Sequence, residues 1–524
     1  MDDDLRQAER AWRSRPDDQP ALARWIDARY RAGLPVDHEL LERQVHPART
    51  LELPMACRVS ALATDGSVTS HELEPGAAVC LPPHTRLWVE PRGATPDSLR
   101  ALARSALPPG TVVCLEGAGL SGTTGLAAVL EGAPWTHVEA ELGLDLGVLE
   151  QVARLPRLAS LYLTRWNDAA PALSSADLAP LSRAPMLSSL WLGCARVAPG
   201  ALAAPAGAAL RELAVAELPP DPSPPVPVDD ELEGLARAAP QLRRLDLGSY
   251  RACGDRGARA LGRSARHLEA LSLGPSPELS DEGVAALGEL PLRELTLDAS
   301  GLTDASARLL ARLPLRELAV WSSSFSADGL RALGAGAAEL SLGLRGHAQL
   351  PGLPGVGERL VELSLQLQDS SRDADLEPLR GARALRELRV WWAWDGVARD
   401  GWLQHLTASD RLTRLQLARP ALSAEGARAL LALPLRELEI FGAPPRDVDQ
   451  GPLELALRRL ADHPTLEQLR IVSCPACSDE VLLAFAAAPS LRRLELRSCP
   501  GVTPRGVERL IAATEGRLRV DSHA

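Results

Sequence analysis

One short leucine pattern recurs along most of this chain of 524 residues and constrains its fold more than any other feature. The pattern is L-x-x-L-x-L, and fourteen clear copies occur at an average spacing of about 26 residues. The copies are LASLYL (158), LSSLWL (187), LRELAV (210), LRRLDL (242), LEALSL (268), LRELTL (292), LRELAV (315), AAELSL (337), LVELSL (360), LRELRV (385), LTRLQL (412), LRELEI (435), LEQLRI (466) and LRRLEL (491). A unit this short cannot bury its apolar face alone, so we expect one stacked array with a continuous core.

Helical patterns lie between these short strands. Three clear examples are SDEGVAALGEL (280–290), TDASARLLARL (303–313) and SAEGARALLAL (423–433). Each begins with a Ser or Thr that is suited to an N-cap, and its apolar residues then follow at spacings of three and four. A strand and a helix in every repeat predict an α/β solenoid.

The region from about residue 109 to 524 resembles leucine-rich repeat proteins of the ribonuclease-inhibitor-like and cysteine-containing types. The LRELTL-type strands carry the resemblance, together with LRIVSCPACSDEVLLAF (469–485) and LELRSCPGVTPRGVERLI (494–511). The resemblance implies a horseshoe with a parallel sheet on the concave side and helices on the convex side. It also implies non-enzymatic protein binding.

Residues 1–108 lack the repeat and are expected to form two further parts. Residues 1–49 predict a helical segment, with helices at 3–15 and 20–33, which resembles a segment that accompanies bacterial repeat proteins and implies no chemistry. Residues 50–108 alternate apolar and polar side chains in short runs, which predicts a small β-rich unit that caps the solenoid. A separate functional module is the alternative for that unit.

The charge balance favours a protein partner. The formal net charge is −11, which disfavours nucleic acid and anionic membranes and favours a cationic protein. Every basic side chain is Arg, a bias typical of a GC-rich, bacterial genome. The first residues lack the apolar stretch of a secretory signal, and no apolar run approaches a membrane span, so we expect a cytoplasmic protein.

No stretch of the sequence predicts catalysis, a metal site or a cofactor. Cys474 and Cys477 form a C-x-x-C pair, but Cys474 aligns with Cys499 one repeat later, so the repeat already explains its position. The glycine-rich stretch 117–132 lacks the Lys of a phosphate-binding loop. The histidines are scattered, and we predict that the chain is not an enzyme.

Side chains between the strand leucines should face the concave side, because successive residues of a strand point to opposite faces. Five consecutive repeats carry glutamate at the third position of the pattern, namely Glu294, Glu317, Glu339, Glu362 and Glu387. In-register strands would place them about 5 Å apart and form an acidic strip. The alternative is that Arg293, Arg316 and Arg386, each preceding one of these glutamates, neutralise the strip.

Aromatic side chains in the neighbouring columns are candidate binding anchors. Tyr162 and Trp191 occupy these columns in early repeats, and the predicted binding surface lies around strands 292–441. Exposed Trp and Arg side chains are typical of binding hot spots. The predicted anchors are Trp321, Arg389, Trp391, Trp392 and Phe441, whereas Trp394 and Trp402 are expected to pack beneath loops and helices.

Three functions remain open from the sequence. The first is a protein-binding module that uses the concave face. The second is an inhibitor or immunity protein that covers a cationic enzyme or toxin with its acidic strip. The third is a scaffold or regulator of bacterial signalling that acts through two loops at the rim of the sheet, residues 219–228 and 442–452.

Overall fold

The computed structural model describes two compact units. Unit 1 comprises residues 1–276 and 289–291, and unit 2 comprises residues 277–288 and 292–524. The described residues are 48–63, 68–91, 96–105, 111–115, 135–141, 147–164, 172–193, 197–216, 226–248, 251–321, 324–345, 350–367, 373–392, 400–420, 422–442 and 451–523, together with Ala8, Leu22, Trp25, Val45, His46, Leu107 and Ala133. Most of the two helices predicted before residue 34 therefore lies outside the described residues, as does most of each predicted rim loop.

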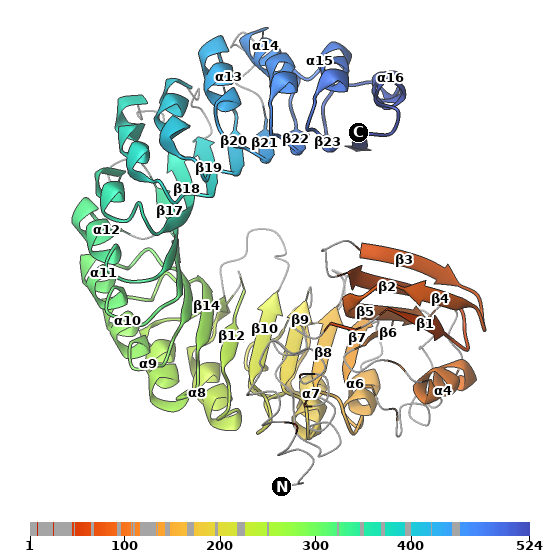
Figure 1. Cartoon of the computed structure of the whole chain (residues 1–524). Coiled ribbons are helices and arrows are strands. Elements are labelled where there is room, and N and C mark those ends of the chain that lie inside the picture. The colour runs from red at the N-terminus through yellow and green to blue at the C-terminus, as the bar shows by residue number, and fades with distance from the viewer. Residues whose placement is uncertain are drawn as a thin grey trace. The chain divides into compact units, whose positions relative to one another are not determined.

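Unit 1 begins with antiparallel strands and continues with parallel ones (Figure 1). Its strands are β1 (Arg49–Glu52), β2 (Cys57–Ala63), β3 (Val68–Leu73), β4 (Ala78–Leu81), β5 (His84–Pro91), β6 (Val112–Leu115), β7 (His137–Glu141), β8 (Ser160–Thr164), β9 (Ser189–Gly193), β10 (Glu212–Ala216), β11 (Val226–Pro227), β12 (Arg244–Asp246), β13 (Arg251–Ala252) and β14 (Ala270–Pro275). Its helices are α4 (Pro96–Arg104), α6 (Gly147–Val152), α7 (Ser175–Leu178), η2 (Ala179–Arg183), α8 (Asp229–Ala238) and α9 (Asp255–Ser264).

Pairing in unit 1 changes direction at β5. Strand β2 lies antiparallel between β3 and β5, and β1 pairs antiparallel with β4. From β5 onward the long strands pair in parallel with the next strand along the chain as far as β14. The strands expected between residues 50 and 93 are therefore present, and their role as a cap stays a prediction.

Unit 2 is a series of parallel strands in which each strand except the last, β24, is followed by a helix, and these helices lie on the same face of the sheet (Figure 1). Its strands are β15 (Glu294–Asp298), β16 (Glu317–Trp321), β17 (Glu339–Arg345), β18 (Leu360–Leu367), β19 (Glu387–Trp392), β20 (Arg414–Ala418), β21 (Glu437–Phe441), β22 (Gln468–Val472), β23 (Arg493–Arg497) and β24 (Arg519–His523). Its helices are α10 (Asp281–Leu287), α11 (Asp304–Leu310), α12 (Ala327–Leu333), η3 (Leu350–Gly355), η4 (Asp373–Gly381), η5 (Gly401–Ala408), α13 (Ala424–Leu431), α14 (Gly451–Arg459), η6 (Leu460–Asp462), α15 (Asp479–Ala484), η7 (Phe485–Ala487) and α16 (Pro504–Thr514).

The core of each repeat is made by the strand leucines and the apolar face of the helix. In β15, for example, Leu295 and Leu297 are at most 2% exposed, and Leu310 from α11 is fully buried. Truncating one such leucine to alanine costs about 2–5 kcal/mol in buried sites. The repeated strand and helix establish an α/β leucine-rich repeat solenoid, as the sequence predicts, while the ribonuclease-inhibitor subtype stays a prediction.

The predicted helix N-caps are confirmed. The side chains of Ser280, Thr303 and Ser423 each accept a hydrogen bond from a backbone N–H in the first turn of the following helix. A cap of this kind satisfies one of the N–H groups that have no partner within the helix. The Ser and Thr residues that open the helical patterns are therefore structural.

Aspartates extend these caps into a link between successive repeats. Asp304 in the first turn of α11 accepts hydrogen bonds from the backbone N–H and the hydroxyl of Ser326, which is the N-cap of α12, at 2.7 and 2.5 Å. Thr503 donates to Asp479 in the same way, at 2.8 and 2.6 Å. Gly329 in α12 leaves the space that Asp304 fills, because a Cβ there would overlap its carboxylate.

Candidate protein-binding surface

We call the face of the unit 2 sheet that carries no described helix the open face. Its side chains come from the third, fifth and seventh residues of the pattern L-x-x-L-x-L-x, and they form three columns across the strands. In β15 these residues are Glu294, Thr296 and Asp298, all partly exposed, whereas the leucines between them are buried. The alternation predicted from the period of a strand therefore holds.

The glutamates of the third column do not form one continuous row, and this part of the prediction is wrong. Glu294 lies opposite Glu317, and Glu317 lies opposite Glu339. Between β17 and β18, however, the register shifts, and Glu362 lies opposite Ser341. Glu362 then pairs in register with Glu387 on β19, which leaves a row of three glutamates and a separate pair.

The shift is accompanied by an irregularity where β18 begins. Leu340 lies opposite Leu360, whereas the next residue, Ser341, lies opposite Glu362, so Val361 has no opposite residue on β17. The connecting helix, η3, is a 3₁₀ helix with Pro354 inside it, but η4 is also a 3₁₀ helix with a proline inside and leads to a strand that pairs in register. Beyond the irregularity Leu342, rather than Leu340, lies opposite Leu363.

Arg389 neutralises the pair formed by Glu362 and Glu387. Its guanidinium lies 2.7 Å from Glu362 and 2.6 Å from Glu387, and all three side chains are about a quarter to a third exposed. The arginines of the second column contact the glutamates less closely, since Arg316 lies 3.7 Å from Glu317 in an exposed pair. The residue that neutralises this pair is thus Arg389 in the fifth column, and not a second-column arginine that directly precedes a glutamate.

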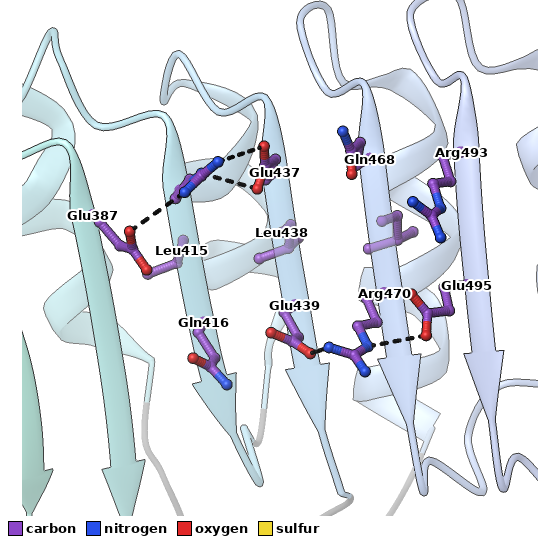
Figure 2. A pocket seen from close by; sticks show the side chains of 12 residues that line it. Glu387, Leu415, Gln416, Glu437, Leu438, Glu439, Gln468, Arg470, Arg493 and Glu495 are labelled. Atoms are coloured by element: carbon purple, nitrogen blue, oxygen red, sulfur yellow. Dashed lines mark hydrogen bonds and ion pairs between the residues drawn. The ribbon is translucent and has the colours of Figure 1, made fainter. Parts of the chain in front are cut away.

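Carboxylates and guanidinium groups continue to alternate on the strands that follow (Figure 2). Arg414 on β20 lies between Glu387, at 3.7 Å, and Glu437 on β21, at 2.9 Å. These side chains line one side of a polar depression of about 220 Å³ on the open face, which also includes the amides of Gln416 and Gln468. Two glutamine amides beside fixed charges could bind the polar groups of a docked protein segment.

Arg470 occupies the other side of this depression. Its guanidinium lies between Glu439, at 2.7 Å, and Glu495, at 3.4 Å (Figure 2). Burial raises the pKa of the Glu439 carboxyl above its ordinary value, and the charge of Arg470 only partly offsets this effect. The depression therefore has a floor of partly desolvated ion pairs whose side chains are held in place by one another.

An aromatic pair lies beside the depression, in the seventh column. Trp391 is 38% exposed, and its ring centroid lies 5.7 Å from that of Phe441 at an interplanar angle of 31°. The guanidinium carbon of Arg470 lies 5.9 Å from the Phe441 ring centroid, within the range of a cation–π contact. Sequence reasoning proposed both rings as anchors but did not identify Arg470 as their neighbour.

The other tryptophans that the sequence predicted around this surface are placed as follows. The ring of Trp321 on β16 covers Gly343 on β17, where a Cβ would overlap it. The backbone of Trp392 pairs with Leu367, whereas its side chain lies outside the described part of the structure, as does the whole of Trp394. Trp402 is 2% exposed, which confirms that it packs in the core.

The structure brings together no metal-binding set within the residues that it describes. No group of three or more His, Cys, Asp or Glu residues there could hold a metal ion. Cys474, Cys477 and Cys499 are free and buried, and burial raises the pKa of the Cys474 thiol to about 11. The glycine-rich stretch 117–132 lies outside the described residues, and no described helix is long and apolar enough to cross a membrane.

No protein-family model matches the chain, and no curated protein matches it. A leucine-rich repeat protein of Leptospira interrogans is similar in structure at 16% identity and a TM-score of 0.34, over 71% of this chain and 91% of that chain. A chain of the TLR13–ssRNA13 complex is similar at 15% identity and a TM-score of 0.36, over 79% of this chain and 52% of that chain. A chain of the yeast Rad7–Elc1 complex is similar at 16% identity and a TM-score of 0.32, over 81% of this chain and 77% of that chain. Similarities this low carry no argument about function, and the fold assignment rests on the repeats of the chain itself.

Proposed function

We propose that the chain is a non-enzymatic protein-binding module and that its partner docks on the open face of unit 2. The observation that carries this proposal is Trp391, which is 38% exposed on a sheet face that no described helix covers. A large exposed ring costs free energy in water and is typical of binding hot spots. Its contact with Phe441 extends the apolar area that a partner would cover.

The side chains around these rings are held in place before a partner arrives. Arg389 is fixed by two carboxylates, and Arg470 is fixed by two others beside Phe441. Long side chains that are already ordered lose less conformational entropy on binding than free ones. The aromatic pair would supply most of the affinity, while the ion pairs around it would set the orientation of the partner.

The partner is expected to present a basic patch. The in-register row of Glu294, Glu317 and Glu339 lies on the same face as the aromatic pair. The exposed contacts of Glu317 and Glu339 with arginines, at 3.7 and 3.9 Å, neutralise them only weakly. A basic patch would be steered toward this row, so association should slow as salt is added.

The test is quantitative affinity capture from a native lysate with the wild-type chain and with Trp391→Ala. The matched control is Ile511→Ala, which removes an apolar side chain that is 44% exposed on helix α16 instead of the open face. We expect Trp391→Ala to reduce recovery of the specific partner at least tenfold and Ile511→Ala to leave it unchanged. Equal recovery of every specific partner by the wild type and Trp391→Ala would overturn the proposal.

A further inference from the structure

A second aromatic pair lies in unit 1. Tyr162 on β8 and Trp191 on β9 are stacked, with ring centroids 3.7 Å apart and an interplanar angle of 9°. Both occupy the fifth column of their repeats, between buried leucines, and both are partly exposed. Both rings therefore lie on the face of the sheet opposite to the face on which the strand leucines are buried.

The ring of Trp191 is fixed by its own strand. It lies across Gly193, where a Cβ would overlap the six-membered ring. Gly193 is thus needed for this placement of the ring. Since Tyr162 stacks against the same ring, the pair is rigid and in place before any ligand binds.

Carboxylates lie in the same column on both sides of the aromatic pair. Glu139 on β7 lies opposite Tyr162. On the other side, Ala214 on β10 lies between Trp191 on β9 and Asp246 on β12. Because neighbouring strands are about 4.8 Å apart, the backbone of Asp246 is roughly 10 Å from that of Trp191, and only the methyl group of Ala214 stands between them.

Asp246 can accept further hydrogen bonds. One carboxylate oxygen accepts the backbone N–H of Gly248 at 3.0 Å. Within the residues that the structure describes, no arginine forms an ion pair with Asp246. A cation placed over Ala214 would therefore meet an aromatic pair on one side and a carboxylate without an ion-pair partner on the other.

We propose that this strip of unit 1 binds an arginine side chain of a partner protein. A guanidinium is planar, stacks on aromatic rings and can donate two parallel hydrogen bonds to one carboxylate, so it matches both sides of the strip. A lysine ammonium is a compact, strongly hydrated charge and matches only the carboxylate. This proposal does not depend on the function proposed for unit 2.

The test uses ¹⁹F NMR of the full chain labelled with 5-fluorotryptophan, in which Trp191→Leu identifies the Trp191 resonance. The probe is N-acetylarginine amide, and the matched probe is N-acetyllysine amide. We expect the arginine probe to shift the Trp191 resonance saturably, with an apparent Kd at least threefold lower than that of the lysine probe. Asp246→Asn should weaken the arginine probe at least threefold while the other tryptophan resonances stay in place, which shows that the variant is folded.

Three outcomes would overturn the proposal. The first is a Trp191 resonance that the arginine probe does not move. The second is equal binding of both probes together with no effect of Asp246→Asn. The third is a shift caused by adenosine and not by the arginine probe, which would assign the rings to a nucleobase.

Discussion

At the scale of single residues, the links between successive repeats depend on aspartate carboxylates. The hydrogen bond from Ser326 holds the pKa of Asp304 below its ordinary value. Because the folded state lowers this pKa, the stability from Asp304 is complete above the unfolded pKa of about 3.9 and is lost as the pH falls through the lowered value.

Asp304→Asn should therefore lower the free energy of unfolding by about 0.5–1 kcal/mol at pH 7, a modest amount because the side chain is still partly exposed to water. The difference from wild type should stay constant above about pH 5 and shrink below about pH 4. Urea denaturation followed by circular dichroism at pH 7, 5 and 3.5 measures it. An unchanged difference at pH 3.5 would contradict this account of Asp304.

Gly329 provides a second prediction at this scale. Replacing a helical glycine with alanine usually stabilises a helix by up to about 1 kcal/mol. Gly329→Ala should instead destabilise the chain by about 1–2 kcal/mol, because its Cβ would displace the carboxylate of Asp304. In an Asp304→Ala background the same substitution should be neutral or stabilising, and a double-mutant cycle of unfolding free energies tests this.

The sequence predicted the helix caps but not the aspartate links. A Ser or Thr before an acidic residue signals a cap locally, whereas the link from Asp304 to Ser326 exists only after two repeats have stacked. A signal for it was nevertheless present. The spacing Ser/Thr-x-x-Gly recurs at 326–329, 423–426 and 503–506, and each of these glycines adjoins an aspartate from the preceding repeat.

At the scale of strands and helices, the repeat predicted each pairing in register, and one pairing differs. Between β17 and β18 the register shifts, and Glu362 lies opposite Ser341. The 3₁₀ helix η3, with Pro354 inside it, does not distinguish this connection, because η4 is also a 3₁₀ helix with a proline inside and leads to a strand that pairs in register. The shift comes with a local irregularity of the strands, which the count of residues between leucines does not contain.

The pairing of β18 with β19 makes a prediction about charge. Arg389→Met should leave Glu362 and Glu387 facing each other and lower the free energy of unfolding by about 1 kcal/mol at low salt. The loss should decrease at 0.5 M NaCl, because salt screens partly exposed charges. Arg316→Met is the matched control, since its contact with Glu317 is long and exposed, and it should change stability by less than about 0.5 kcal/mol. Equal losses in the two variants would contradict the role given to Arg389.

At the scale of the whole molecule, the fold was predictable because one repeated pattern specifies the same strand and the same buried leucines many times. The surface was predictable only in part. The period of the strand placed the glutamates and Trp391 on the open face, but it could not show that Arg389 and Arg470 each lie between two carboxylates. These contacts depend on side-chain rotamers and on the register of neighbouring strands.

Docking of a partner protein on the open face of unit 2 can be tested by photo-crosslinking. A photoreactive amino acid is placed at Gln366, which lies exposed on β18 opposite Trp391, or at the exposed Arg428 on helix α13. We predict a specific protein adduct in native lysate from position 366, lost when Trp391→Ala is added, and no such adduct from position 428. A specific adduct from position 428 alone, or one from position 366 that survives Trp391→Ala, would contradict it.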